Sequence, residues 1–438
     1  MKKHTQSPYE SSKVSYKPSG IEWLGEIPKH WEVKKIKYIY KSINGFTPDT
    51  SNASYYDNFN GYDWITISDI NKKYVNESEV KVSQKYIDKF HPQVTPKGSL
   101  LYSFKLSVGL VAFAKKDIYT NEAVLSFLNT NDVDLNFLYY SSFLIQFNAK
   151  ENIYGAKLLN KELINNAFMV FPPLQEQKEI AEFLDKKCEK IQNYINKKQK
   201  LITLLQEKKQ ALINEVVTKG LNPNIEFKNS GIDYLGLIPH HWEIKKLKYV
   251  GKVVLGKMLC NEHQKGYSHC YYLKSKNLQW LNVEVSQIEK MWFSEYEKSL
   301  YRIKKDDLLV SEGGEVGKTC IWNNELAECY IQNSVHKITL NKFNNAKFFL
   351  YLFFTYGKLG VFDSVVSRVS IAHLVLEKLV NVDMVVPPLQ EQKQIANFLD
   401  EKCEKINSAI EKTKRQIELI KEYKNTLINE AVCGRIKL

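Results

Sequence analysis

The chain has 438 residues, enough for two or three domains, and its 44% hydrophobic content excludes an extended disordered chain. Its formal net charge of +13 favours a polyanionic partner, most often nucleic acid. No stretch approaches the roughly 20 apolar residues that span a bilayer, and the seven scattered cysteines fit a reducing compartment. We therefore expect a cytoplasmic protein without a membrane partner.

Two motifs occur twice, which indicates an internal duplication. The run SGIEWLGEIPKHWEVKKIKY at 19–38 returns as SGIDYLGLIPHHWEIKKLKY at 230–249. Further along, PPLQEQKEIAEFLDKKCEKI at 172–191 returns as PPLQEQKQIANFLDEKCEKI at 387–406, with 17 of 20 positions identical. A period of more than 200 residues predicts duplicated domains rather than a solenoid of short repeats.

The two interiors between these motifs diverge, and they are predicted to mix strands with helices. Runs rich in β-branched and aromatic residues predict strands; they are DWITISDI, SLLYS and VGLVAFA in the first half, and DLLVS and KTCIWN in the second. FLYYSSFLIQFNA at 137–149 and KFFLYLFFTYGK at 347–358 have the apolar composition of buried helices. Trp31 and Trp242 lie in the shared motif, so we expect them to anchor the core rather than to read bases.

Each repeated Pro-Pro pair is followed by a hydrophobic repeat with alternating steps of four and three. The repeat runs from Leu184 to Val216 in the first copy and from Leu399 to Ala431 in the second. This spacing is typical of a coiled coil over more than four heptads. Because neither helix can cover its stripe alone, we expect the two helices to pack on each other, antiparallel, as a spacer between two different heads.

These paired motifs resemble the specificity (S) subunit of Type I restriction–modification enzymes. The strongest markers are P-P-L-x-E-Q at 172–177 and 387–392 and G-x-I-P-x-H-W-E at 25–32 and 236–243. The resemblance covers the chain from Ser19 onward and implies one target recognition domain in each half. Each domain would recognise one part of an asymmetric, bipartite site in double-stranded DNA, and the paired helices would set the unread gap.

The predicted fold class is α+β, with two α/β target recognition domains separated by two long helices that pack as an antiparallel coiled coil. The repeat is expected to be pseudo-twofold. The expected segments are an N-terminal tail at 1–18, target recognition domain 1 at 19–171, spacer helix 1 at 172–217, a linker at 218–229, target recognition domain 2 at 230–386, spacer helix 2 at 387–434 and a C-terminal tail at 435–438.

The same resemblance implies a non-catalytic subunit of a complex that defends against foreign DNA. The paired helices would dock two modification (M) subunits, which bind S-adenosylmethionine and methylate adenine at N6. Restriction (R) subunits would add an ATP-dependent endonuclease. The chain itself is expected to hold no cofactor and no metal, because S-adenosylmethionine, ATP and Mg²⁺ are expected on the partner subunits.

Residues that distinguish two DNA sequences must differ between the halves, so we expect them in the divergent polar stretches. The first half has no arginine, the residue that most often contacts guanine. Arg368 is the best candidate for such a contact, the alternative being an ordinary surface ion pair. We expect the lysines to bind phosphates. The predicted DNA-binding residues are Lys72, Lys73, Lys105, Tyr154, Lys157 and Asn160 in the first half and Lys274, Lys276, Asn277, Lys318 and Arg368 in the second.

The alternative function is a self-sufficient DNA-modifying or DNA-cleaving enzyme. The lack of a complete catalytic motif in the sequence argues against it. GGEVGKT at 313–319 lacks the first glycine of a phosphate-binding loop, because Glu312 takes its place. Asp69, Glu79 and Lys81 have the spacing of some metal-dependent nucleases, but such a pattern arises by chance in a chain this rich in charge.

Four possible zinc ligands cluster in the second half. They are Cys260, His263, His269 and Cys270. Their spacing is not a standard one, and adjacent ligands at the last two positions are awkward for a tetrahedral site. We therefore expect a loop of polar, partly buried residues here.

Overall fold

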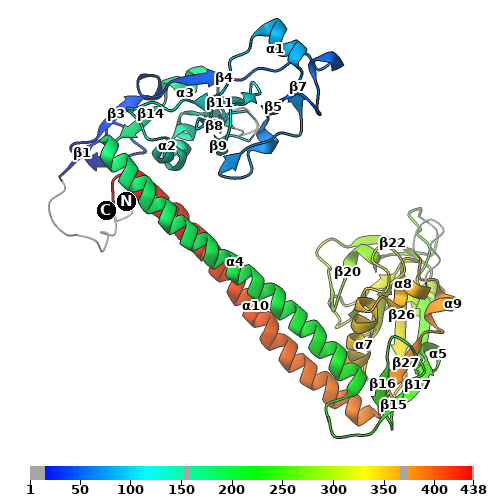
Figure 1. The fold of residues 1–438 in the computed structure, drawn as a ribbon. Helices are drawn as coiled ribbons and strands as arrows, with labels where there is room; N and C mark the ends of the chain where they lie inside the picture. Colours follow the sequence, from blue (N-terminus) through cyan, green and yellow to red (C-terminus); the bar gives the residue numbers. More distant parts are fainter. Residues whose placement is uncertain (1–14, 106, 152–156, 264, 366–372, 437–438) are drawn as a thin grey trace. The chain divides into compact units, whose positions relative to one another are not determined.

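The computed structural model describes residues 15–436 except 106, 152–156, 264 and 366–372. The chain divides into two compact units, of which unit 1 holds residues up to Lys197 together with those from Gln416 on, and unit 2 holds Lys198–Arg415. Two long helices, α4 (Leu174–Lys219) and α10 (Leu389–Val432), each contribute one half to each unit (Figure 1). No helix among the described residues is long and apolar enough to cross a membrane.

The head of unit 1 is built on two sheets. The larger has the order β4-β11-β8-β9-β6 and the smaller the order β10-β5-β7. Every residue of β8 and β11 is buried, as expected for central strands covered on both faces. The bounds are β4 (Ser42–Asn44), β11 (Val124–Phe127), β8 (Leu100–Ser103), β9 (Val111–Ala114), β6 (Tyr74–Val75), β10 (Tyr119–Thr120), β5 (Tyr62–Ile65) and β7 (Lys81–Val82).

Three helices and three strand pairs complete this head. The helices are α1 (Gln84–Phe90), α2 (Leu135–Ser141) and α3 (Lys161–Asn166). The pairs join β1 (Tyr16–Pro18) to β2 (Glu26–Pro28), β3 (Glu32–Lys35) to β14 (Phe168–Phe171), and β12 (Lys150–Glu151) to β13 (Lys157–Leu158). The β3–β14 pair brings the end of the opening motif beside the last strand before α4.

The head of unit 2 has a four-stranded sheet in the order β18-β26-β23-β24 and a three-stranded sheet in the order β22-β19-β25. The strands are β18 (Gly251–Leu255), β26 (Val335–Leu340), β23 (Leu308–Ser311), β24 (Thr319–Ile321), β22 (Glu289–Phe293), β19 (Ser268–Leu273) and β25 (Tyr330–Ile331). The pairs are β15 (Phe227–Asn229) with β16 (Leu237–Pro239), β17 (Glu243–Lys246) with β27 (Asp383–Val386), and β20 (Leu278–Gln279) with β21 (Asn282–Val283). The helices are α5 (Leu247–Val250), α6 (Glu295–Tyr301), α7 (Ala346–Lys358), α8 (Val361–Val365) and α9 (Leu376–Leu379).

The two heads share one topology although their interiors differ in sequence. The order β4-β11-β8-β9 in unit 1 matches β18-β26-β23-β24 in unit 2, and β10-β5-β7 matches β25-β19-β22. In both heads the strand after the His-Trp-Glu motif pairs antiparallel with the strand before the Pro-Pro pair. The predicted internal repeat of two α/β heads is therefore confirmed.

The first buried helix differs from its prediction. A helix over 137–149 was expected, but α2 ends at Ser141 and continues as a 3₁₀ helix over Ser142–Asn148. The Ser142 hydroxyl donates to the carbonyl of Tyr139 at 3.1 Å. This side-chain bond of Ser142 competes with the backbone bonds of the helix at the residue where the α-helix gives way to the 3₁₀ helix.

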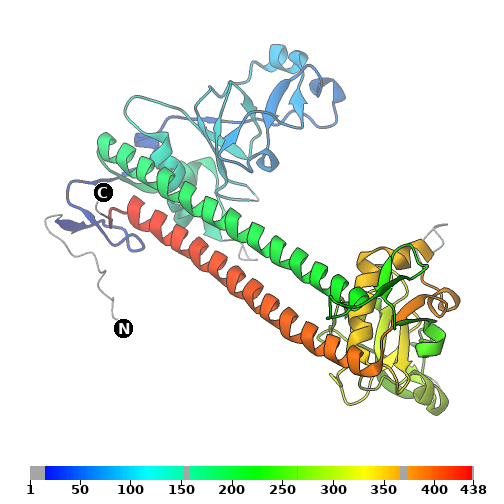
Figure 2. The same cartoon turned by 60° about the horizontal axis from the view of Figure 1, so that its bottom comes forward.

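Both units contain an antiparallel helix pair, in agreement with the coiled-coil prediction. Each position of the predicted stripe, from Leu184 to Val216 and from Leu399 to Ala431, is buried or half-buried. In unit 2, Lys209 of α4 donates to Asn407 of α10 at 2.9 Å. In unit 1, Cys188 of α4 and Lys424 of α10 line the same cleft. Figures 1 and 2 both show α4 and α10 side by side within each unit.

The helix ends belong to the core of the head. Ile213 and Val217 of α4 and Leu399 of α10 lie in one buried cluster with Trp242 and Phe348 of unit 2. Burial of such side chains stabilises the fold by about 1.5–3 kcal/mol each. Each head is therefore continuous with its part of the helix pair.

Candidate nucleic-acid interface

Each head is held on its helix pair by the glutamine of the repeated P-P-L-x-E-Q motif. The Gln177 side chain is fully buried; it donates from Nε2 to the carbonyl of Pro172 at 2.8 Å and accepts the N–H of Asp134 at 3.0 Å. Gln392 makes the same pair of bonds, to Pro387 at 2.8 Å and from Asn345 at 2.8 Å. Asp134 and Asn345 cap α2 and α7, so one amide joins the starts of two helices in each head.

The glutamate of the same motif binds the opening motif. Glu176 accepts the indole N–H of Trp31 at 2.8 Å and lies 2.7 Å from His30 Nε2. Glu391 lies 2.8 Å from His241 Nε2 in the second head. The indole rings at both motif positions are buried, which confirms that these tryptophans are core anchors. The repeated residues are thus used for attachment.

A tyrosine–aspartate bond adds a second attachment about two turns further along each long helix. Tyr140 donates to Asp185 in unit 1, and Tyr351 donates to Asp400 at 2.8 Å in unit 2. Burial, reinforced by the hydrogen bond to the carboxylate, raises the pKa of both tyrosines, so both hydroxyls remain protonated donors. These contacts leave the divergent loops of each head as the surface available for recognition.

Several lysines predicted to contact DNA are paired with carboxylates. Lys72 is exposed, and it lines a cleft of about 1140 Å³ together with Lys73. A paired ammonium presents a weaker field to a phosphate than a free one does, although such surface pairs contribute little to stability. The pairs are Lys73–Asp185 at 2.5 Å, Lys105–Glu122 at 2.8 Å and Lys318–Glu315 at 3.0 Å.

Glu289 forms ion pairs with two more of the predicted lysines. Its oxygens lie 2.6 Å from Lys274 Nζ and 2.9 Å from Lys276 Nζ, and it also accepts the hydroxyl of Tyr272 at 2.9 Å. These hydrogen bonds, the one from Lys274 first, lower the pKa of Glu289 to about 2. Asn277 is buried, and its amide binds the backbone of the surrounding loop. The cluster therefore presents one net positive charge at neutral pH.

Two of the four remaining predicted residues lie in described parts of the first head. Asn160 is exposed and caps α3, accepting the N–H of Leu163 at 2.8 Å. Lys157 is in strand β13. Tyr154 and Arg368 lie outside the described residues.

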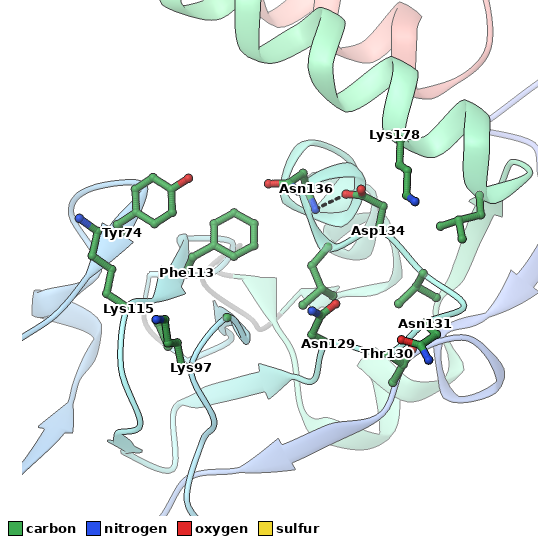
Figure 3. A pocket seen from close by; sticks show the side chains of 15 residues that line it. Tyr74, Lys97, Phe113, Lys115, Asn129, Thr130, Asn131, Asp134, Asn136 and Lys178 are labelled. Atoms are coloured by element: carbon green, nitrogen blue, oxygen red, sulfur yellow. Dashed lines mark hydrogen bonds between the residues drawn. The ribbon is translucent and has the colours of Figure 1, made fainter.

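Three lysines that sequence reasoning did not select surround a cleft of about 750 Å³ in unit 1 (Figure 3). Lys97 precedes β8, Lys115 follows β9, and Lys178 lies in the first turns of α4. Tyr74 stands at the rim with the Lys115 ammonium 5.3 Å from its ring centre. Within the part of the chain that the structure describes, no carboxylate lies within ion-pairing distance of these three ammonium groups. Asp134 is an acidic residue of the lining, and its carboxylate caps α2. The cleft therefore combines three lysines and one aspartate with an exposed aromatic ring, and such an excess of cations beside an aromatic ring is typical of nucleic-acid sites.

The corresponding cleft of unit 2 has a different charge. It measures about 330 Å³ and is lined by Lys305 and Lys347, but also by Asp306 and Asp307. Lys347 pairs with Asp400. The equivalent positions KGSLL at 97–101 and KDDLL at 305–309 show that aspartates replace a glycine and a serine. This substitution is the signal in the sequence for the difference in charge between the two clefts.

The structure assigns other roles to residues of the catalytic alternatives. Asp69 accepts the backbone N–H of Thr66 at 2.7 Å, which ends strand β5 in a turn. His263 and His269 both pack on Trp292. Their ring centres lie 4.6 and 4.7 Å, respectively, from that of Trp292. No group of three or more possible metal ligands occurs among the described residues.

The duplicated heads and their attachment motifs match a known family. The profile of the Type I restriction modification DNA specificity domain matches residues 28–206 and again 239–419. The chain belongs to this family. Specificity subunits are non-catalytic, and the role of this one is recognition of DNA sequence.

Full-length relatives and solved structures agree with this family. The specificity subunit of the type I restriction enzyme MjaIX from Methanocaldococcus jannaschii is 24% identical and covers 95% of each chain. A chain from a structure of the type I R-M system superposes with a TM-score of 0.72 at 16% identity, covering 94% of this chain and 99% of that one. The HsdS subunit from Thermoanaerobacter tengcongensis gives a TM-score of 0.55 at 17% identity, over 94% and 98% of the two chains. These structures share the fold of this specificity subunit.

Proposed function

We propose that each head recognises one part of an asymmetric, bipartite DNA site. One observation carries this proposal: equivalent glutamine contacts attach two heads whose interiors and equivalent clefts differ in sequence and charge. Two different heads select two different half-sites, whereas identical heads select a palindrome. The paired helices would set the length of DNA between the half-sites.

The phosphate contacts would come from unpaired lysines first. Lys97, Lys115 and Lys178 add to the eleven predicted residues as a cationic cleft on the first head. The paired lysines would exchange their carboxylates for phosphates when DNA binds. Counterion release from such contacts makes affinity strongly dependent on salt.

The partners follow from the family. Two modification subunits would dock on the paired helices and supply S-adenosylmethionine-dependent methylation of adenine at N6. Restriction subunits would supply the ATP- and Mg²⁺-dependent endonuclease, so the chain needs no cofactor of its own. The complex would act in the cytoplasm, where it meets foreign DNA.

Adenine methylation across the host genome, with and without this gene, tests the proposal directly. We expect methylation to disappear from one split, asymmetric motif when the gene is deleted. Methylation that persists unchanged at every motif would contradict the proposal. Incubation of the purified chain with plasmid and Mg²⁺ tests the enzymatic alternative, which predicts cleaved or modified DNA without any other subunit.

A further inference from the structure

Both heads expose the same tyrosine next to the same lysine. Tyr38 is 75% exposed and Tyr249 is 65% exposed, and they occupy equivalent places in EVKKIKY and EIKKLKY. The Lys37 ammonium lies 5.2 Å from the Tyr38 ring centre, and the Lys248 ammonium lies 5.5 Å from that of Tyr249. An exposed tyrosine alone needs no explanation, but the same arrangement on two otherwise divergent surfaces does.

An asparagine fixes the lysine in each head. Lys37 Nζ donates to Asn166 Oδ1 at 3.0 Å, and Lys248 Nζ donates to Asn381 Oδ1 at 3.0 Å. Each asparagine is itself held by a bond from Nδ2 to a backbone carbonyl four residues earlier, at 3.0 Å in unit 1 and 2.8 Å in unit 2. Three residues therefore recur with the same hydrogen bonds, although Asn166 follows Tyr38 by more than a hundred positions.

The asparagine orients the ammonium without neutralising it. In the described part of the chain, no carboxylate forms an ion pair with Lys37 or Lys248. This differs from Lys73, Lys105 and Lys318, which all have carboxylate partners. A fixed, uncompensated cation beside a phenol hydroxyl is suited to an anion that can accept from both.

Both heads should bind the same kind of ligand, because the same lysine, tyrosine and asparagine recur in both. Bases differ between two half-sites, whereas phosphates do not, so residues shared by both heads can bind phosphate without reading sequence. Lysine is depleted at protein–protein interfaces and frequent at phosphates.

We propose that Lys37 with Tyr38, and Lys248 with Tyr249, bind DNA backbone phosphates as a pair of sequence-independent contacts, one on each head. This inference rests on the proposed function, because it assumes that both heads engage the same DNA. It assigns affinity and positioning to these residues, and it leaves the choice of sequence to the divergent loops.

The test measures binding of the full-length chain, with its modification subunits, to target and scrambled duplexes over a range of salt. The double variant K37Q/K248Q removes two phosphate contacts, so the slope of log affinity against log salt should fall by about 1.8. Between 50 and 200 mM salt, the variant should then lose about twelvefold less affinity than the wild type does. The ratio of target to scrambled affinity should stay unchanged.

Two controls make the outcome decisive. K186Q/K405Q removes the same charge from lysines paired with carboxylates on the long helices and should leave the slope within a few tenths of wild type. K37R/K248R keeps the charge and should restore the slope, which excludes misfolding as the cause. An unchanged slope in K37Q/K248Q, or weaker binding of the modification subunits in its place, overturns this inference. Wild-type complex that does not distinguish target from scrambled duplex would refute the proposed function instead.

Discussion

Replacement of Gln177 by alanine should release the first head from its helix pair. The side chain satisfies the Pro172 carbonyl in a buried bond and the Asp134 N–H in a part-buried one. Leaving a buried polar group without its partner costs about 1–3 kcal/mol. Two such groups give about 2–6 kcal/mol, a large fraction of the stability of a domain.

Hydrogen exchange can assign this loss to one head. We expect the amides of α2 and of the β3–β14 pair to exchange at least about thirtyfold faster in Gln177→Ala, since 1.4 kcal/mol is a factor of ten. Gln392→Ala should produce the same effect in α7 and the β17–β27 pair, because Gln392 makes the equivalent bonds. Exchange of the first head should remain unchanged in that variant.

Exposed glutamines of the same turns provide matched controls. Gln175 is exposed and donates to Glu179 along the helix, and Gln390 is exposed. Alanine at either position should change exchange by less than about threefold, since surface substitutions stay within ±0.5 kcal/mol. If the amides of the first head exchanged at the same rate in Gln177→Ala and Gln175→Ala, the buried side-chain amide of Gln177 would not be what attaches the head.

Three further changes test the charged surface and the second attachment. Glu289→Gln should steepen the salt dependence of binding to a scrambled duplex by about one to two units, because two lysines lose their carboxylate; an unchanged slope would show that these lysines do not meet DNA. Since the pKa of Glu289 is lowered from 4.5 to about 2, its stabilising contribution is present above pH 4.5 and lost as the pH falls toward 2, so thermal melts of the wild type should show a loss over that window that the variant lacks. Lys97→Gln with Lys178→Gln should reduce the salt slope by about 1.8 units in the same binding assay, and no reduction would exclude the cleft from the interface. Tyr351→Phe should destabilise unit 2 by about 1–3 kcal/mol in hydrogen exchange, whereas Tyr296→Phe, at an exposed site, should not; equal effects would show that the bond to α10 does not stabilise the head.

The fold could be predicted because its signals are local or repeated. The steps of four and three place apolar residues on one helix face, and the structure buries or half-buries each of them. The two copies of the P-P-L-x-E-Q motif mark the start of both long helices, which begin at Leu174 and Leu389. The exception over 137–149 lies at Ser142, whose hydroxyl bonds to the backbone, and a hydrophobic pattern does not report such a bond.

The charged surface could not be predicted to the same extent, because its partners come from distant segments. Asp185 is 112 positions from Lys73, and no spacing rule links them. Lys97, Lys115 and Lys178 come from three separate elements and meet only in the folded head. One part of this result was visible in the sequence: Lys-Gly-Ser in the first head stands where the second has Lys-Asp-Asp.

The division between shared and divergent residues also explains how one chain can hold two different readers. The contacts that attach a head use the glutamine and glutamate of one repeated motif and a histidine or tryptophan of the other. These side chains lie in the repeated motifs, whereas the tyrosine that bonds to each long helix comes from the interior, where both heads keep it. The rest of the interior of a head can therefore change without loss of its attachment. Contacts with invariant chemistry, such as phosphates, can be placed in the shared motifs for the same reason. Selection for a new target would then act on loops whose mutation leaves both the attachment and the backbone contacts intact.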